Sequence, residues 1–261
     1  MAKICTDRKY TVVISDTHFS ENYPEITQRF IEFLEYNKTA IETLYLLGDL
    51  FDAWIGDDHI TPLSQKISDI LADCANDGMK IYFMRGNRDY LMGEKFAASC
   101  NMTLLDDKTV ISLYGKKTLL MHGDLLCTDD RAYQKYRKIM FSPIMKKICL
   151  MLPLNFRKKI AEKLRKVSQE SNATKSMHIM DVSENSVIQV LEQYHAELLI
   201  HGHTHRQANH TVTLMHQSAQ RMVLGAWENT QGNAIVASEI EAPRFINFDN
   251  ATKNLVASTE F

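Results

Sequence analysis

Five short segments of this chain carry side chains that could bind metal ions, and each segment ends a hydrophobic run. They are Asp16-Thr17-His18, Gly48-Asp49, Gly86-Asn87-Arg88-Asp89, His122-Gly123-Asp124 and the stretch from His201 to His205. Short apolar runs bounded by turn residues are typical of buried strands, and in open α/β folds ligands bind beyond the carboxyl ends of the strands. We therefore expect these carboxylate, amide and imidazole groups to converge in one crevice and form a metal site.

Each segment alone has an ordinary structural explanation. Gly-Asp and Gly-Asn pairs are commonly turns, in which the Asp or Asn side chain bonds its own backbone, and an Asp-x-His pair is usually a turn as well. The sequence Gly-His-Thr-His at 202–205 is a moderate indication of metal binding by itself. The presence of all five segments in one chain favours a metal site over five independent turns.

The expected metal donors are imidazole and carboxylate groups, without thiolate. Such a set suits Mn, Fe, Zn or Co better than Mg or Ca, and it is not the donor set of a structural cysteine–zinc site. The five cysteines form no Cys-x-x-Cys pair, which favours reduced thiols and a cytoplasmic protein.

The order of these motifs resembles the calcineurin-like metallophosphoesterases, and the resemblance implies two metal ions, for which we expect Mn²⁺, with Fe, Co or Zn as alternatives. One ion would be bound by Asp16, His18, Asp49 and His205, and the other by Asp49, Asn87, His122 and His203. Asp49 would bridge them, since a carboxylate offers two oxygens. Two ions about 3.5–4 Å apart can generate a hydroxide and hold the oxygens of an in-line phosphoryl displacement, so no protein nucleophile is needed.

Position 88 departs from the broad family pattern, in which Gly-Asn is often followed by a histidine that can act as a general acid. Arg88 is always protonated and cannot shuttle a proton, but its guanidinium suits bidentate contact with phosphate oxygens. The leaving group should therefore need little protonation, as a phosphate monoester would. The structural alternative is an arginine that pairs with Asp89.

Longer stretches resemble a narrower family, the UDP-2,3-diacylglucosamine pyrophosphohydrolases of lipid A synthesis in Gram-negative bacteria. The stretches are GDLFDAWIGDD (48–58), GNRDYL (86–91), HGDLLCTDD (122–130), NATKSMHIMDV (172–182), IHGHTHR (200–206) and VLGAW (223–227). The resemblance runs from about Tyr10 to about Phe248. Small departures, such as Arg85 where histidine is usual, remove none of the metal ligands.

This resemblance implies an enzyme that hydrolyses the diphosphate of UDP-2,3-diacylglucosamine, a lipid-linked nucleotide sugar. A metal hydroxide would attack the uridine-side phosphorus, giving UMP and 2,3-diacylglucosamine 1-phosphate. The expected catalytic residues are Asn87, Arg88 and His122, and the expected substrate contacts are Asn87, Arg88, Asp130, Ser168, Asn172, Lys175 and His203. For Ser168 and Asn172 the alternative is ordinary polarity on a helix surface.

Two other functions use the same residues. A phosphodiesterase or nucleotide pyrophosphatase would act on a water-soluble substrate at the same two metals. A non-catalytic scaffold would keep the fold without the chemistry, but all seven expected ligands are present, which argues against it.

The segment from Arg131 to Lys166 contains twelve Lys or Arg and one acidic residue, Glu162, whereas the whole chain has 30 basic and 32 acidic residues. It is also rich in apolar residues, which predicts basic amphipathic helices, with Pro143 and Pro153 starting or breaking them. Such helices bind membrane surfaces or anionic ligands.

Three interpretations of this basic segment are open: a helical cap packed on the core, a nucleic-acid surface, or a lipid-binding lid. The scarcity of aromatic residues in the segment and the acidic body argue against nucleic acid, despite the attraction of phosphates to basic residues. We favour the lid, which would contact an anionic membrane as a peripheral protein on the cytoplasmic face of the inner membrane. The acyl chains would enter between cap and body, lined by residues among Phe141, Met151, Leu152 and Phe156.

The pattern of apolar runs predicts an α/β fold, a two-sheet αββα sandwich formed by residues 1–125 and 171–261, with residues 126–170 as an inserted cap. Helices are expected over 24–38, 62–77 and 177–194, and strands near 10–15, 43–47, 80–84, 103–105, 109–113, 117–121, 197–201, 210–215, 221–225, 233–239 and 244–248. No run reaches the roughly 18–20 apolar residues of a membrane span, and no hydrophobic signal core follows the first residue. The oligomeric state is not determined by the sequence; a monomer is our expectation.

Overall fold

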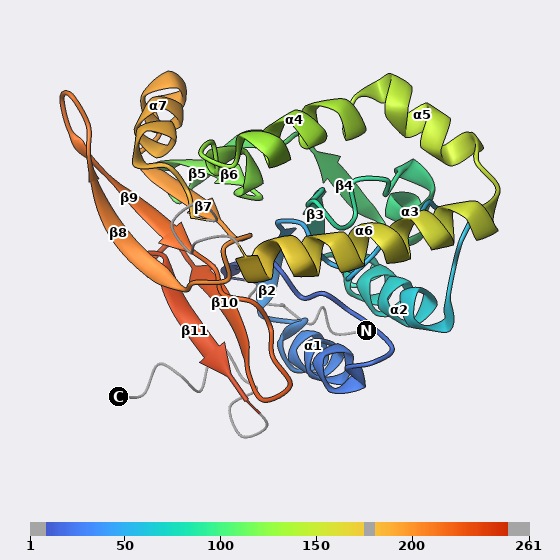
Figure 1. Cartoon of the computed structure of the whole chain (residues 1–261). Coiled ribbons are helices and arrows are strands. Elements are labelled where there is room, and N and C mark those ends of the chain that lie inside the picture. The colour runs from blue at the N-terminus through green and yellow to red at the C-terminus, as the bar shows by residue number, and fades with distance from the viewer. Residues whose placement is uncertain (1–8, 175–180, 250–261) are drawn as a thin grey trace, which may run out of the picture.

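The computed structural model describes residues 9–174 and 181–249 of the chain and consists of two sheets with helices on their outer faces (Figure 1). The first sheet has the order β11-β10-β1-β2-β3-β4, in which β1 to β4 run parallel and β10 and β11 are antiparallel. The second has the order β5-β6-β7-β9-β8, with β6, β7 and β9 parallel. The predicted αββα sandwich is therefore confirmed.

The strands bear out most of the apolar runs. They are β1 (Tyr10–Ile14), β2 (Ile41–Leu46), β3 (Lys80–Met84), β4 (Met102–Leu105), β5 (Lys108–Leu113), β6 (Lys116–Met121), β7 (Leu198–His201), β8 (Ala208–Thr213), β9 (Ser218–Val223), β10 (Gly232–Ala237) and β11 (Arg244–Phe248). Parallel strands that are buried on both faces read as continuous hydrophobic runs. In β1, Val12 and Ile14 face the helices, whereas Val13 faces the second sheet.

Three helices cover the outer face of the first sheet, and one covers the second. They are α1 (Pro24–Asn37), α2 (Pro62–Asn76) and α3 (Glu94–Ser99) on the first sheet, and α7 (Glu184–Tyr194) on the second. A central apolar layer joins the sheets, with Met84 from one and Ile200 from the other at its centre. The carboxyl ends of β1, β2, β3, β6 and β7 meet at one edge of the sandwich, where the segments that follow these strands are joined to each other by hydrogen bonds.

The prediction of α7 was wrong at residues 181–183, which precede the helix, and α3 was not predicted. The helix begins at Glu184 rather than Met177, because the Ser183 N–H donates to the carbonyl of Leu126 (2.9 Å) and the Val182 N–H to the Asp181 carboxylate (2.8 Å). Residues 177–180 lie outside the described part. The α3 helix is only 6 residues long, too short for its apolar spacing to show a period.

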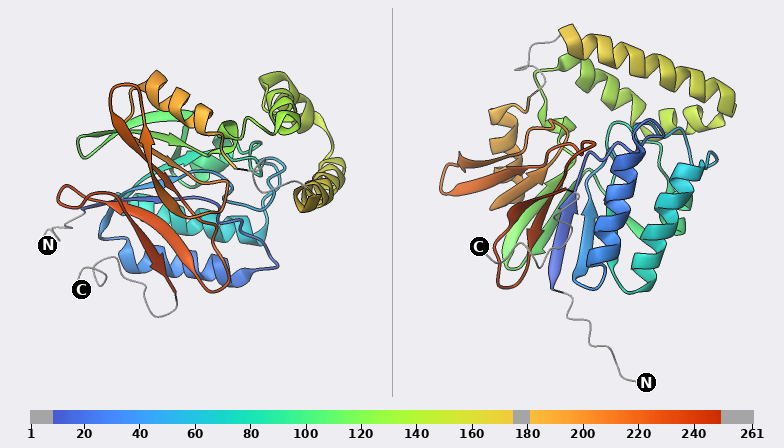
Figure 2. Two further views of the ribbon diagram at one scale, coloured as in Figure 1. Left: turned by 60° about the vertical axis from the view of Figure 1, so that its left-hand side comes forward. Right: turned by 90° about the horizontal axis from the view of Figure 1, so that it is seen from below.

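Three further helices lie together at one end of the sandwich (Figure 2): α4 (Arg131–Met140), α5 (Pro143–Met151) and α6 (Leu154–Thr174). Pro143 occupies the first turn of α5, and Ser142 caps that helix by accepting from the Met145 N–H. Pro153 directly precedes α6. The prolines thus separate the helices as the sequence predicts.

Arginines attach these helices to the body at three places. Arg157 of α6 is buried, pairs with Asp58 and donates to the carbonyl of Ile55. Arg165 of α6 pairs with Asp52. On α4, Arg137 contacts two acidic residues of the body, which are Asp124 at 2.5 Å and Asp107 at 3.0 Å. Part of the positive charge of the basic segment therefore serves internal attachment.

We expect Arg157→Met to loosen α5 and α6 without unfolding the sandwich. The substitution keeps an apolar stem but leaves the Ile55 carbonyl without its charged donor, a loss of about 1–3 kcal/mol. Hydrogen exchange measured by mass spectrometry should rise in α5 and α6 and stay unchanged in β1 to β3. Lys158→Met, an exposed position on the same helix, is the control. Equal protection in both variants would show that Arg157 does not hold the helices.

Candidate metal centre

The predicted metal ligands stand in strained backbone. Five of the eight non-glycine residues with positive φ in the described part are predicted ligands, namely Asp16 (55°), His18 (47°), Asp49 (53°), His203 (68°) and His205 (59°). Residues other than glycine rarely adopt this backbone conformation, and each residue that does so raises the free energy of the folded state. The concentration of strain at the ends of β1, β2 and β7 indicates that these loops are shaped for a site rather than for stability.

Glycines in the same motifs allow the ligand loops to approach each other. A Cβ on Gly202 would lie 2.1 Å from Asp16 Oδ2, and a Cβ on Gly86 would lie 2.2 Å from Asp49 Oδ1. Each glycine therefore leaves room for a carboxylate of another motif, which is why Gly-Asn and Gly-His occur where they do.

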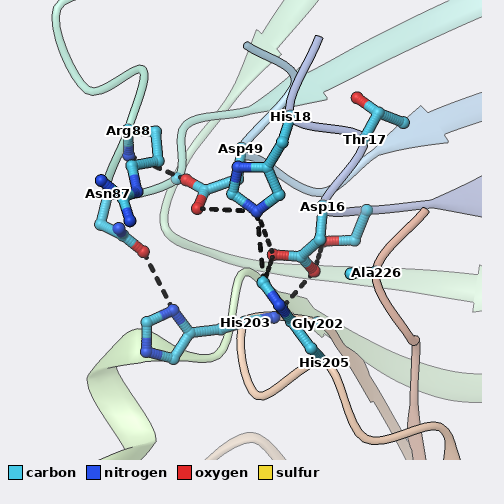
Figure 3. Close-up of polar contacts among 12 residues, drawn as sticks. Asp16, Thr17, His18, Asp49, Asn87, Arg88, Gly202, His203, His205 and Ala226 are labelled. Carbon is cyan, nitrogen blue, oxygen red and sulfur yellow. Dashed lines mark hydrogen bonds and ion pairs between the residues drawn. The ribbon is translucent and has the colours of Figure 1, made fainter. Parts of the chain in front are cut away.

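Asp16, His18 and His205 form one group of donors (Figure 3). Asp16 Oδ2 accepts from the Ser15 hydroxyl (2.6 Å) and from the His203 N–H (2.8 Å). Asp16 Oδ1 is buried and makes no hydrogen bond among the described residues, and it lies 3.4 Å from His205 Nε2 and 3.9 Å from His18 Nε2. A buried carboxylate oxygen without a hydrogen bond, facing two imidazole nitrogens, fits a bound cation.

Asn87, His122 and His203 form a second group. The Asn87 side-chain oxygen lies 3.0 Å from His122 Nε2 and 2.9 Å from His203 Nδ1. Asp49 stands between the groups, with Oδ1 3.7 Å from His122 Nε2 and Oδ2 3.7 Å from His18 Nε2. The structure thus gathers all seven predicted ligands and turns one oxygen of Asp49 toward each group.

A neighbouring hydrogen bond orients His122. Its Nδ1 lies 2.8 Å from the carbonyl of Leu47, so Nδ1 carries the proton and Nε2 presents its lone pair to the site when the ring is neutral. Leu47 directly follows β2, and the same strand end therefore positions both Asp49 and this imidazole.

The pKa values of the ligands are suited to the binding of a cation. Burial and the nearby Asp16 carboxylate raise the pKa of Asp49 to about 6. Burial favours the neutral ring of His122, but the Asp49 and Asp16 carboxylates outweigh it and raise its pKa to about 9. Burial lowers the pKa of His18 and of His203 to about 4. His18 and His203 are therefore neutral at pH 7, as metal ligands must be.

The model of the calcineurin-like phosphoesterase family matches residues 10–207. The chain belongs to the calcineurin-like phosphoesterase family. It therefore contains a metallophosphoesterase domain, and the grouped carboxylates and imidazoles are suited to a divalent metal.

Relatives of the chain carry one name. A protein of Photorhabdus laumondii named UDP-2,3-diacylglucosamine hydrolase is 47% identical over 84% of this chain and 91% of its own length. Proteins of the same name from Yersinia enterocolitica and Escherichia coli K12 are each 44% identical over 90% of this chain and 98% of theirs. The similarity extends beyond the family motifs to nearly the whole chain.

The predicted substrate residues are placed unevenly. Asp130 is the N-cap of α4 and accepts from the Tyr133 N–H (3.1 Å), so it has a structural role. Ser168 and Asn172 belong to α6, but only the backbone of that turn is described, and Lys175 lies outside the described residues. The side chains of Ser168, Asn172 and Lys175 thus lie outside the described part, and the substrate contacts of these residues and of Asp130 stay predictions.

Three supporting residues were not among the predicted metal ligands, catalytic residues or substrate contacts. Asp89 accepts the N–H groups of Gly86 and Leu50, each at 2.7 Å, and so joins two ligand loops. The Tyr133 ring stacks on His203 (6.1 Å between centroids), and its hydroxyl donates to Asp124 (2.7 Å). Asp89 and Asp124 lie in the quoted motifs, which was the available signal, whereas nothing in the sequence distinguishes Tyr133 from other cap residues.

Metal affinity should rise with pH. His122 carries a proton below about pH 9, and a metal must displace that proton to bind, so the apparent affinity should increase about tenfold per pH unit between 7 and 9. Calorimetric titration of the metal-free chain with Mn²⁺ in two buffers of different ionisation enthalpy should show release of about one proton or more at pH 7.5. Binding that releases no proton and is flat over this range would contradict the assignment of His122 as a ligand.

Proposed function

We propose that this chain hydrolyses UDP-2,3-diacylglucosamine to UMP and 2,3-diacylglucosamine 1-phosphate in lipid A synthesis, by attack on the uridine-side phosphorus with two Mn²⁺ ions. The observation that carries the proposal is the convergence of seven ligands, with Asp49 at their centre, in a chain whose relatives of that name match it over 91–98% of their length. Identity of 44–47% across nearly the whole chain supports the same substrate.

The residues divide the work at the diphosphate. Asp16, His18, Asp49 and His205 would hold one ion, and Asp49, Asn87, His122 and His203 the other. Bound ions would supply Lewis acidity to the phosphoryl oxygens and to the attacking water. The imidazole and carboxylate donors are compatible with Mn²⁺. Asp16, Asp49 and His122 are buried, so their charges act at a lower local dielectric than in solution.

Arg88 is suited to hold the diphosphate rather than to support the fold. Its backbone N–H donates to Asp49 Oδ1 (2.8 Å), which fixes its loop against the carboxylate between the two donor groups. Its charge contributes to lowering the pKa of His18, so the guanidinium lies near the centre. The structural alternative, a pair with Asp89, loses support because that carboxylate accepts two backbone N–H groups instead.

Purified protein with Mn²⁺ in detergent should release UMP from UDP-2,3-diacylglucosamine, and EDTA should abolish the release. Asp49→Ala should abolish it too, because Asp49 faces both donor groups, whereas Asp69→Ala, an exposed carboxylate on α2, should not. In ¹⁸O-labelled water the label should appear in UMP. Label in the lipid phosphate would place the attack on the other phosphorus. Hydrolysis of generic phosphodiesters alone would support the metal centre but contradict the assignment of the lipid substrate.

We further propose that residues 126–170 form a lid that meets an anionic membrane on the cytoplasmic side. Exposed apolar side chains gather there; they are Tyr136, Ile139, Ile144, Ile148, Leu150, Met151, Phe156, Ile160 and Leu164. The α5 helix buries none of its residues, and Phe141 packs on Tyr90 of the body (4.8 Å between ring centroids). No helix of the described residues could cross a membrane. An exposed apolar surface flanked by lysines supports contact with the surface of an anionic bilayer.

Vesicle binding tests the lid. The chain should co-sediment with vesicles that contain anionic lipid and less with neutral ones, and added salt should weaken binding. Met151→Asp, at the end of α5 and 75% exposed, should weaken binding about tenfold. Met215→Asp, equally exposed at 78% but on the β8–β9 turn, should have no effect. Equal loss in both variants, or no preference for anionic lipid, would contradict the lid.

A further inference from the structure

The loop that follows β9 lines a pocket beside the metal centre, and the metal chemistry gives this loop no role. It contains the end of the VLGAW stretch at 223–227 and continues through Glu228, Asn229 and Thr230. The pocket has a volume of about 490 Å³, within the range of small-ligand sites. Its walls include His18, Tyr23, Asp52, His205, Glu228 and Asn229, together with residues of the core and of α6.

The pocket opens onto one side of the centre only. Two of the residues that line it, His18 and His205, carry the imidazoles that face Asp16 Oδ1. The other side, at Asn87 and His203, meets α4 through the stacking of Tyr133. The two halves of a diphosphate substrate leave the scissile phosphorus by different bonds, so each half needs its own path away from the metals. The pocket supplies one such path, and α4 borders the other through Tyr133.

The character of the walls excludes two parts of the substrate. Asp52 and Glu228 are acidic and Asp52 already pairs with Arg165, so the pocket does not offer net positive charge to a phosphate. Its apolar members Ile26 and Trp227 are buried in the core, and none of the exposed apolar side chains of α4, α5 and α6 is among its walls, so it offers no open apolar surface to an acyl chain. A neutral, polar and partly aromatic group fits these walls best.

We propose that this pocket binds the uracil and ribose of the nucleotide half. The identity of the nucleoside rests on the proposed function, but its class, a neutral nucleoside next to a phosphate on the metals, follows from the walls. The ring of Tyr23 is 47% exposed at the pocket edge and offers a stacking face for a base. The side-chain amide of Asn229 has both an acceptor and donors, which complement the N3–H and carbonyl groups of uracil. The Glu228 carboxylate can accept hydrogen bonds from the ribose hydroxyls.

The wall is rigid where it joins the centre. The backbone N–H of Trp227 donates to the backbone carbonyl of Asp16 (3.1 Å), which joins the loop to a metal ligand. Buried Arg29 of α1 donates to the carbonyls of Glu228 (3.1 Å) and Asn229 (2.7 Å). A tight turn between Glu228 and Gln231 closes the loop. The side chains of the wall are thus presented by a fixed backbone, as recognition of a small ligand requires.

The test is calorimetric binding of UMP to the Mn²⁺-loaded full chain. Tyr23→Ala and Asn229→Ala should each raise the Kd for UMP about tenfold, the effect expected for loss of a base-stacking or polar contact. Tyr36→Ala, an exposed tyrosine at the other end of α1, should leave it unchanged. Ribose 5-phosphate, which lacks the base, should compete more weakly than UMP. Melting curves would verify that all variants fold.

Wild-type affinity in both Tyr23→Ala and Asn229→Ala, or equal competition by ribose 5-phosphate, would overturn the proposal, as would the absence of UMP binding by the unaltered chain. Steady-state hydrolysis of UDP-2,3-diacylglucosamine separates it from the proposed function. If the two variants raise KM with kcat nearly unchanged, both stand. If the substrate is hydrolysed but the variants behave as wild type, only the pocket fails. If UMP binding depends on Tyr23 but the lipid substrate is not hydrolysed, only the proposed function fails.

Discussion

Asp16 and Asp49 place two carboxylates in one buried volume, with donor atoms less than 4.8 Å from each other and from His122. Burying two like charges is costly unless a cation or hydrogen bonds compensate. Part of the compensation is built from the chain, since Ser15 and the His203 N–H donate to one oxygen of Asp16. The other oxygen, Oδ1, faces the imidazoles of His18 and His205. The positive-φ ligands, the close glycines and the buried Asp89 all serve to hold these carboxylates in place.

This constraint explains how much of the site the sequence could reveal. The motif order predicted which side chains converge, because ligand positions at strand ends follow from the topology of an open sheet. The order could not show that Asp49 turns a different oxygen toward His18 and His122, which depends on the left-handed backbone at Asp49. The apolar runs likewise predicted the sandwich and β3 and β11 to the residue. The start of α7 was missed because the N–H groups of Ser183 and Val182 donate to Leu126 and Asp181, outside the helix, contacts that the apolar spacing does not show.

The helices over the centre show the same division. Proline positions predicted where α5 and α6 begin, and the count of basic residues predicted a positive segment. The count could not distinguish charges that face solvent from those that dock the helices, and Arg137, Arg157 and Arg165 belong to the second kind. Asp52, Asp58 and Asp124, to which these arginines are attached, lie in the stretches 48–58 and 122–130, which also contain metal ligands. The covering helices and the metal ligands are thus held by the same short segments.

The most direct test of the central claim is anomalous X-ray scattering from crystals grown with Mn²⁺. The proposed centre predicts two peaks, one among Asp16, His18 and His205 and one among Asn87, His122 and His203, with one oxygen of Asp49 on each. A single peak, or two peaks that do not share Asp49, would contradict a two-ion centre bridged by this carboxylate.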